Sequence, residues 1–168
     1  MIISVIGSSS ALPEHAVIAE DFGAEIAKCP GVEYVVCGGM GGIMEAVCKG
    51  VHKSVQLHNS SCKTIGILPG SQKDSGNKHI DIPIVTGMGF ARNIVVALTG
   101  DVVVAIGGAY GTLSELGHAL SEGRPVISLM SWDFDVTGER DIVTEKSDFT
   151  RVYDVATAVQ EVLRYQGA

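Results

Sequence analysis

The chain has 168 residues, of which 46 % are hydrophobic and 18 % charged, which suits one compact domain over residues 1–168 and excludes a disordered chain. Its formal net charge of −7 excludes a general nucleic-acid-binding or anionic-membrane surface, because both need clustered lysine and arginine. The four cysteines contain no CxxC pair, and no stretch reads as a signal sequence or is long enough to span a bilayer, so we expect a reduced, cytoplasmic protein.

The first predicted strand and helix flank a turn of small hydroxyl residues. The apolar run Ile2–Ile6 predicts a buried strand, and the pattern after Pro13 predicts a helix from about Glu14 to Lys28. Between them lies Gly7-Ser8-Ser9-Ser10. These hydroxyls either donate to phosphate or ribose oxygens or are ordinary turn residues.

A glycine-rich turn follows the second predicted strand. Glu33–Cys37 is predicted as that strand and Ile43–His52 as the next helix, with Gly38-Gly39-Met40-Gly41-Gly42 between them. Four glycines in five positions exceed what a simple reversal of direction needs, so close approach of a ligand is the preferred interpretation. Glu45, near the helix start, either caps the helix or contacts the ligand.

The middle of the chain predicts two strands and a helix that begins with an unusual arginine. Thr64–Leu68 and Ile82–Thr86 are predicted as strands, and the polar segment Ser71–His79 as an exposed loop able to cover a ligand. The helix runs from about Phe90 to Leu98, with Arg92 in its first turn, where the helix dipole disfavours a cation. Arg92 is therefore either a surface residue or a fork of donors aimed at an anion.

The helix predicted at Phe90–Leu98 is apolar nearly all round after its first turn. Such a helix must be buried on more than one side. We therefore expect a homodimer or homotetramer that forms through this helix.

The stretch Asp101–Leu120 joins a strand, a glycine turn and a helix. Asp101–Ile106 predicts the strand and Leu113–Leu120 the helix, with glycines at positions 107, 108 and 111 between them. The free N–H groups and positive dipole end of the helix form a ready site for phosphate or carboxylate. Thr112 and Glu115 fit either a T-x-x-E capping box or a ligand site, in which Thr112 donates to phosphate and Glu115 acts as acceptor or general base.

The C-terminal part of the chain predicts two more strands and a closing helix. The predicted segments are a strand at Pro125–Leu129, a polar and acidic loop at Ser131–Asp148, a brief strand at Arg151–Tyr153 and a helix at Val155–Tyr165. Strands that alternate with helices at these lengths predict an α/β fold, a Rossmann-like doubly wound parallel sheet of about six or seven strands with helices on both faces. In such folds the turns after the strands meet at the carboxyl edge of the sheet, so one pocket can collect all three glycine-containing turns.

The motif GGAYGTLSE at residues 107–115 resembles the PGGxGTxxE signature of the family once labelled lysine decarboxylase-like. That family contains the cytokinin-activating LOG phosphoribohydrolases and the molybdenum cofactor carrier proteins. Ile106 stands where LOG enzymes have proline, and Asn93 stands where they have the lysine of an Arg-Lys pair. The longer run Ala91–Leu129 is more similar to the carrier branch.

The resemblance implies a binding or carrier protein for a phosphorylated nucleotide-like or pterin ligand, with the molybdenum cofactor or a nucleoside monophosphate as the candidate bound molecule. The predicted ligand-binding residues are Gly7, Ser8, Ser9, Gly39, Met40, Gly41, Gly42, Arg92, Asn93, Gly107, Gly108, Ala109, Tyr110, Gly111, Thr112 and Glu115. The alternative is a LOG-like phosphoribohydrolase that cleaves nucleoside 5′-monophosphates, for which the resemblance implies Arg92 and Glu115 as the catalytic pair. A structural oligomer with a vestigial pocket is the third possibility.

Other motifs are absent or weak. Neither glycine turn spells G-x-G-x-x-G and no P-loop is present, which argues against dinucleotide redox chemistry and against an NTPase. Cys48, His52, His58 and Cys62 have a spacing compatible with zinc, but core cysteines and solvated histidines are the simpler interpretation, so we predict no metal site.

Overall fold

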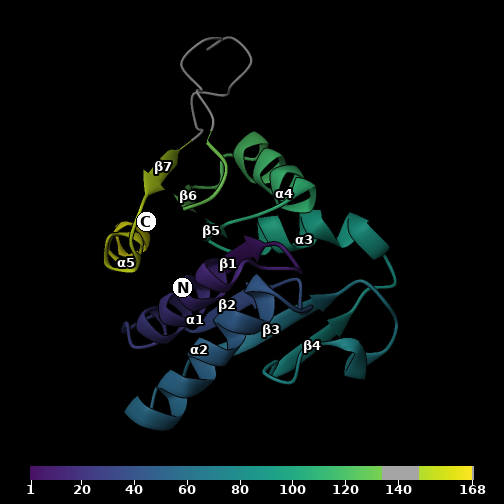
Figure 1. The fold of residues 1–168 in the computed structure, drawn as a ribbon, viewed down its shortest axis with the longest axis horizontal. Coiled ribbons are helices and arrows are strands. Elements are labelled where there is room, and N and C mark those ends of the chain that lie inside the picture. The colour runs from purple at the N-terminus through teal and green to yellow at the C-terminus, as the bar shows by residue number, and fades with distance from the viewer. Residues whose placement is uncertain (134–147, 168) are drawn as a thin grey trace.

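The computed structural model describes residues 1–133 and 148–167, which form seven β-strands, five α-helices and two short 3₁₀ helices (Figure 1). The strands are β1 Ile2–Gly7, β2 Tyr34–Cys37, β3 Lys63–Leu68, β4 Ile82–Val85, β5 Val102–Ile106, β6 Val126–Leu129 and β7 Phe149–Val152. The helices are α1 Pro13–Ile26, α2 Ile43–His58, α3 Arg92–Thr99, α4 Tyr110–Ser121 and α5 Val155–Leu163, with the 3₁₀ helices η1 Lys73–Ser75 and η2 Gly89–Ala91.

All seven strands lie in one sheet in the order β4-β3-β2-β1-β5-β6-β7, and every described pairing is parallel. The chain builds outward from β1 in one direction through β4, then returns to the other side of β1 with β5. β1 and β5 therefore flank the point at which strand order reverses, which is where ligands bind in sheets of this kind. This confirms the predicted doubly wound parallel fold.

Helices cover both faces of the sheet (Figure 1). On one face, side chains such as Phe22 of α1 and Val47 of α2 pack with Ala158 of α5 against β1 and β5. On the other face, Val96 of α3 and Leu116 of α4 pack against a second cluster from the sheet. Alternate residues of β1 face opposite clusters, as Val5 and Ile6 do, because successive strand side chains point to opposite faces.

Most predicted boundaries differ from the observed ones by only one or two residues, but three need a physical explanation. α2 continues to His58, six residues beyond the predicted end, and stops where Asn59 adopts the left-handed conformation that ends helices. α4 begins at Tyr110 rather than Leu113, so the last residues of the predicted glycine turn already belong to the helix. The predicted helix Phe90–Leu98 is split into η2 and α3, and α3 begins at Arg92.

The segment predicted as an exposed loop at Ser71–His79 is held against the second glycine turn. The Asn77 backbone N–H donates to the Gly39 carbonyl at 2.9 Å, and Asn77 Nδ2 donates to the Met40 carbonyl at 3.0 Å. Most of the loop predicted at Ser131–Asp148, residues 134–147, lies outside the described residues.

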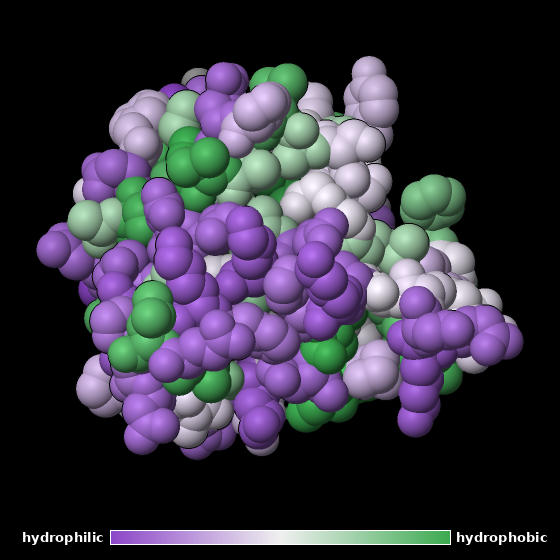
Figure 2. Space-filling view, turned by 60° about the horizontal axis from the view of Figure 1, so that its bottom comes forward, coloured by the Kyte–Doolittle hydropathy of each residue, from purple (hydrophilic) through white to green (hydrophobic). Residues whose placement is uncertain are grey.

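The surface combines a hydrophilic face with a local group of exposed apolar residues. Figure 2 shows hydrophilic side chains across the middle of one face, with hydrophobic side chains in smaller groups toward its margins. The largest run of exposed apolar residues in the described chain extends from the edge strand β4 to α3: Ile82, Ile84, Val85, Met88, Phe90 and Ile94. Within the described ranges, no helix combines the length and hydrophobicity needed to cross a membrane.

Candidate functional site

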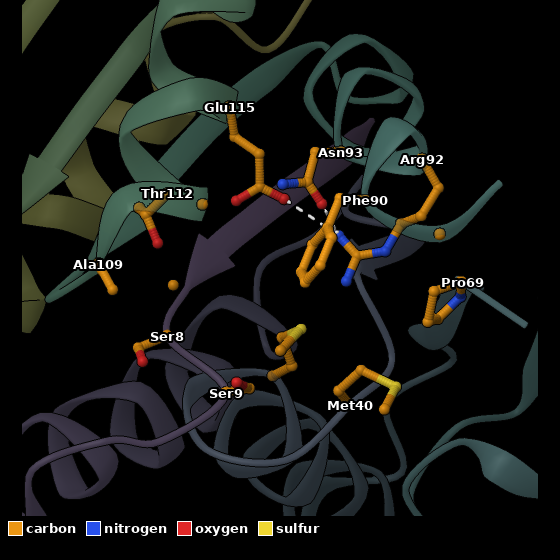
Figure 3. Close-up of a pocket in the computed structure, with 14 residues that line it drawn as sticks. Ser8, Ser9, Met40, Pro69, Phe90, Arg92, Asn93, Ala109, Thr112 and Glu115 are labelled. Carbon is orange, nitrogen blue, oxygen red and sulfur yellow. Dashed lines mark hydrogen bonds and ion pairs between the residues drawn. The ribbon is translucent and has the colours of Figure 1, made fainter.

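A cavity of about 410 Å³ opens at the carboxyl edge of the sheet, next to β1 and β5. The turn after β1 and the opening of α4 form one side of it, and the start of α3 forms another (Figure 3). Its volume lies within the roughly 300–1,000 Å³ typical of small-molecule sites. The predicted meeting of separate turns at one edge therefore produces an actual pocket.

The structure brings most of the predicted site residues together in this cavity. The predicted residues that line it are Gly7, Ser8, Ser9, Met40, Arg92, Asn93, Ala109, Gly111, Thr112 and Glu115. Within the described chain, six predicted residues stand outside this lining: Gly39, Gly41, Gly42, Gly107, Gly108 and Tyr110. Tyr110 instead points to solvent, with 84 % of its surface exposed.

Four lining residues were not predicted: Met44, Pro69, Gly89 and Phe90. Met44 lies in the first turn of α2, and Pro69 directly follows β3, so both follow from the rule that ligands lie at the carboxyl ends of strands. Phe90 lines the cavity yet is 90 % exposed, which places it at the mouth. The position of Phe90, two residues before the predicted site residue Arg92, was the sequence signal that could have placed it in the cavity lining.

The N-terminus of α4 opens into the cavity without a side-chain cap. Its N-cap is Ala109, and the first intrahelical bond runs from the Leu113 N–H to the Ala109 carbonyl at 3.1 Å. Thr112 is therefore the third helical residue and not the cap, so the capping-box alternative is wrong. Thr112 and Glu115, three residues apart, share the helix face that lines the cavity. The first N–H groups of this helix form an anion-binding end.

The opening of α2 is partly filled by the protein's own backbone. The Ile43 N–H donates to the Ser8 carbonyl at 3.0 Å, and a Cβ on Gly42 would lie 2.3 Å from that same oxygen. Gly42 therefore has to be glycine because the turn after β1 packs directly against it. The turn before α2 contributes Met40 to the wall and α2 itself contributes Met44, while the helix opening that no backbone carbonyl fills belongs to α4.

The turn after β1 supplies hydroxyl groups to the cavity. Ser8 Oγ accepts a hydrogen bond from the Ser10 backbone N–H at 3.1 Å, which is the turn role considered from the sequence. Its hydroxyl hydrogen is still able to donate to a bound oxygen, since acceptance uses only a lone pair. Ser8 thus has the turn role, and its hydroxyl hydrogen is not used by this hydrogen bond.

Arg92 and Glu115 form a buried ion pair in the cavity wall. Arg92 Nη1 lies 3.4 Å from Glu115 Oε1 and also donates to Asn93 Oδ1, and the three side chains converge in Figure 3. Only 7 % of Arg92 and 5 % of Glu115 are exposed, so the surface-arginine alternative is wrong. Arg92 Nε is buried and has no hydrogen-bond partner among the described residues, so it is a charged donor that these residues leave unsatisfied.

Burial controls the ionisation of this pair. Desolvation raises the pKa of Glu115 to about 7, against the opposing attraction of Arg92. Desolvation likewise lowers the pKa of Arg92, while Glu115 and Cys37 oppose that shift. A carboxyl group that titrates near neutral pH can accept or donate a proton under physiological conditions.

Gly38 positions the guanidinium of Arg92. A Cβ on Gly38 would lie 2.5 Å from Arg92 Nη2 and 2.7 Å from Cζ, so the guanidinium packs against the glycine backbone. Gly38 belongs to the glycine turn identified in the sequence, but it was not among the predicted site residues. The role of Gly38 becomes visible only in the folded structure, because Arg92 is far away in the sequence.

We expect Gly38→Ala to weaken binding of a nucleoside monophosphate about tenfold, because it displaces a charge-assisted donor. The fold is expected to persist, because the end of the Arg92 side chain can move away from the added methyl group. Circular dichroism checks the fold. Calorimetric titration with AMP measures the affinity. Gly70→Ala is the matched control, because a Cβ there would meet no atom within 4 Å. Equal affinity in both variants would contradict the positioning role.

The zinc-compatible side chains do not come together. Cys48 Sγ contacts Cys37 Sγ at 3.6 Å, whereas His52 Nε2 lies 3.4 Å from Asp81 Oδ1. Within residues 1–133 and 148–167, no group of three or more His, Cys, Asp or Glu side chains is placed to hold a metal ion. The metal interpretation of Cys48, His52, His58 and Cys62 has no support in this part of the chain.

The fold and the cavity together define a class: a Rossmann-like α/β protein with a small-molecule pocket at the switch point of a parallel sheet, next to an uncapped helix opening and a buried Arg-Glu pair. The profile of the SLOG cluster4 family matches residues 1–163, and the chain belongs to that family. This agrees with the resemblance of residues 107–115 to the LOG-like signature.

Similar proteins include both uncharacterised and functionally described ones. An uncharacterised protein of Archaeoglobus fulgidus is 40 % identical over 129 residues, which cover 77 % of this chain and 80 % of that protein. The molybdenum cofactor binding protein of Rippkaea orientalis superimposes with a TM-score of 0.79 at 31 % identity, over 97 % of this chain and 95 % of the other. The molybdenum cofactor carrier protein of Chlamydomonas reinhardtii gives a TM-score of 0.79 at 29 % identity, over 99 % and 98 %.

Proposed function

We propose that this protein binds or carries a small phosphorylated molecule, a nucleotide-like or pterin compound, in the cavity between α3 and α4. The observation that carries the proposal is that the buried Arg92 guanidinium and the uncapped start of α4 line the same cavity. A helix N-terminus and an arginine fork are two complementary ways to hold a phosphate group. Their occurrence in one pocket favours an anionic ligand despite the negative net charge of the chain.

The other side of the cavity suits a flat, apolar group. Met40, Met44, Pro69 and Phe90 contribute thioether, ring and aromatic surfaces to the wall. Aromatic rings stack on other planar rings, and methionine adapts its shape to irregular partners. A phosphate at the α4 end and a heterocycle near Phe90 would use both halves of the pocket.

The molybdenum cofactor is the specific ligand that the comparisons suggest. The Rippkaea and Chlamydomonas proteins are described by their binding and carriage of that cofactor. The partnerless Nε of Arg92 and the donors of α4 fit the phosphate of such a pterin compound. The cofactor would be the cargo of this protein. The residues that line the cavity would contact the phosphate and the ring of the cofactor rather than its metal.

A phosphoribohydrolase is the second candidate, and the Arg92–Glu115 pair is the observation that favours it. A carboxyl group with its pKa near 7 inside a pocket is suited to proton transfer or to stabilising a positive ribosyl centre. Arg92 would hold the phosphate while Glu115 acts at the glycosidic bond of a nucleoside 5′-monophosphate. The Arg92–Glu115 pair fits either a carrier or an enzyme, so a turnover assay distinguishes the two functions.

The full-length chain is to be incubated with AMP, and both binding and release of ribose 5-phosphate are to be measured. Carriage predicts saturable binding without release of base, and the freshly purified protein, once denatured and oxidised, is expected to yield a fluorescent pterin. Catalysis predicts ribose 5-phosphate that disappears in Glu115→Ala. Failure of AMP, other monophosphates and pterin to associate with the protein would contradict both functions.

We also propose that the protein forms a homodimer or homotetramer through the region Phe90–Leu98. Ile94 remains 37 % exposed on α3, and it continues the run of exposed apolar residues that begins in β4. Several exposed apolar side chains close together in the sequence are typical of an association site when they share one face of the protein. A second copy of the chain is the occupant that would bury the exposed apolar side chain of Ile94 on α3.

Ile94→Glu is expected to shift the protein toward the monomer, because it places a charge in an apolar interface. Light scattering after size-exclusion chromatography measures the mass. Leu57→Glu provides the control, since Leu57 is 68 % exposed on α2, away from this region. A monomeric parent protein, or equal masses in both variants, would show that this surface is not the interface.

A further inference from the structure

Two thiols meet directly behind the wall of the cavity. Cys37 is the last residue of β2, Cys48 lies in α2, and their sulfur atoms are 3.6 Å apart. Both residues are fully buried. Cys29 and Cys62 are placed differently, because their sulfurs lie near the Glu25 and Lys63 carbonyls at 3.6 and 4.0 Å. One pair of the four cysteines is thus preassembled.

The two thiols have different acidities. The pKa of Cys37 is lowered by its hydrogen bond with Cys48 and, against burial, by the Gly39 N–H and the charge of Arg92. The pKa of Cys48 is raised by that same bond and by burial. Cys37 is therefore the more acidic of the two thiols. A more acidic thiol beside a second cysteine can be oxidised reversibly where an oxidant reaches it, and here that requires the buried pair to become accessible.

The pair also brackets a segment of the pocket wall. The residues between the two cysteines include the Gly38–Gly42 turn and the first turn of α2, which contribute Met40 and Met44 to the cavity. The Gly39 N–H donates to Cys37 Sγ at 3.4 Å, and the Gly38 backbone supports Arg92. These contacts connect Cys37 directly to the turn that shapes the site.

We infer that Cys37 and Cys48 form an oxidisable dithiol whose closure to a disulfide displaces the Gly38–Gly42 turn at the edge of the pocket. A disulfide requires the sulfurs to approach to about 2.05 Å. β2 is fixed by its neighbours β1 and β3 on both sides, so the adjustment falls mainly on α2 and the turn. Oxidation of this dithiol would link ligand binding in the cavity to the redox state of the cell.

The chemistry balances with a peroxide as the oxidant. The Cys37 thiolate attacks one oxygen of hydrogen peroxide, the O–O bond breaks, and the departing hydroxide takes up a proton to give water, leaving a sulfenic acid on Cys37. Cys48 sulfur then attacks the Cys37 sulfur, the S–O bond breaks, and the Cys48 proton leaves with the hydroxyl group as a second water. Two thiols lose two electrons, and one peroxide gains them.

Mass spectrometry tests whether this bond forms. The reduced full-length protein is treated with hydrogen peroxide, free thiols are alkylated in denaturant, and peptides are mapped before and after dithiothreitol. We expect one reversible link between the peptides of Cys37 and Cys48, which persists in Cys29→Ser and is absent from Cys48→Ala. Both cysteines fully alkylated, or the more exposed Cys29 alone oxidised, would overturn the inference.

Nuclear magnetic resonance tests whether the bond reaches the pocket wall. The amide resonances of Gly39 and Met40 are expected to shift on oxidation and return on reduction, while those of α5 stay in place. Unchanged Gly39 and Met40 resonances in a protein with the link formed would overturn the proposed displacement. Neither measurement depends on a ligand, so the result stands apart from the proposed function.

One consequence rests on the proposed function. Oxidation is expected to weaken AMP binding roughly tenfold, within the range usual for coupling between linked sites. Dithiothreitol should restore the affinity, and peroxide should leave the affinity of Cys37→Ala unchanged, because that variant lacks the thiol that attacks the peroxide. Absence of AMP binding by the reduced protein counts against the proposed function, whereas equal affinities of the reduced and oxidised forms count against the coupling.

Discussion

Arg92→Ala is expected to lower the affinity for AMP roughly a hundredfold, the loss usual when a buried charged partner of an anion is removed. Arg92 lies in the cavity wall with only 7 % of its surface exposed, and its Nε has no hydrogen-bond partner among the described residues. Among the described residues that line the cavity, no other is a lysine, arginine or histidine. The loss is therefore expected to be much larger than for removal of a surface charge.

Two variants separate the local role of Arg92 from general electrostatics. Arg164→Ala removes the same charge from an exposed position directly after α5, where the Arg164 side chain pairs with Glu161 at 2.6 Å. Calorimetric titration should find nearly parental affinity for this control and an intermediate value for Arg92→Lys, because lysine retains the charge but loses the fork. A similar loss from Arg92→Ala and Arg164→Ala would indicate that long-range charge alone controls binding.

The Glu115 carboxyl is expected to make the protein less stable as pH rises from about 4.5 to 7. Burial raises the pKa of Glu115 in the folded protein to about 7, so over this range the folded state holds a proton that the unfolded state has lost. Stability falls with pH wherever the folded state binds more protons. The change amounts to about 3 kcal/mol for a shift of this size.

Urea unfolding of the parent protein and Glu115→Gln across this pH range measures the effect. Glutamine keeps the shape of the protonated side chain but does not titrate, so the difference in unfolding free energy between the two proteins should increase in favour of the variant as pH rises. Glu115→Ala also removes the titrating carboxyl, so its unfolding free energy should likewise depend less on pH than that of the parent protein. A constant difference from pH 4.5 to 8 would show that Glu115 keeps an ordinary pKa.

The fold followed from the sequence because its signals are local. Apolar β-rich runs such as Val102–Ile106 alternate with helices, and parallel strands covered on both faces are the arrangement that buries them. The carboxyl-edge rule then predicted that the turns near Ser8, Met40 and Thr112 share one pocket. Each inference used short spacings along the chain together with a general rule of topology.

The errors arose where tertiary packing overrides local preference. Tyr110 and Gly111 resemble turn residues, yet they form the first turn of α4. Gly42 resembles a ligand-binding glycine, but it accommodates the Ser8 backbone. The supporting role of Gly38 depends on an arginine fifty-four positions later in the sequence, and that proximity has no local signature.

The cysteines show the same limit. Spacing alone grouped Cys48 with two histidines and Cys62 as possible zinc ligands, because all four are close in sequence. In the structure, packing of α2 on β2 places Cys48 against Cys37 instead. The pairing connects a strand end to a helix face, which periodicity cannot specify.

Titration of the isotope-labelled protein with AMP, followed by amide resonances and by the side-chain Nε resonance of Arg92, tests most directly whether α4 and α3 grip one phosphate. The amides of Tyr110, Gly111 and Thr112 and the Arg92 Nε should shift together with a single saturation curve. Saturable binding that leaves these four resonances unmoved, or that moves only surface amides away from the cavity, would contradict the account.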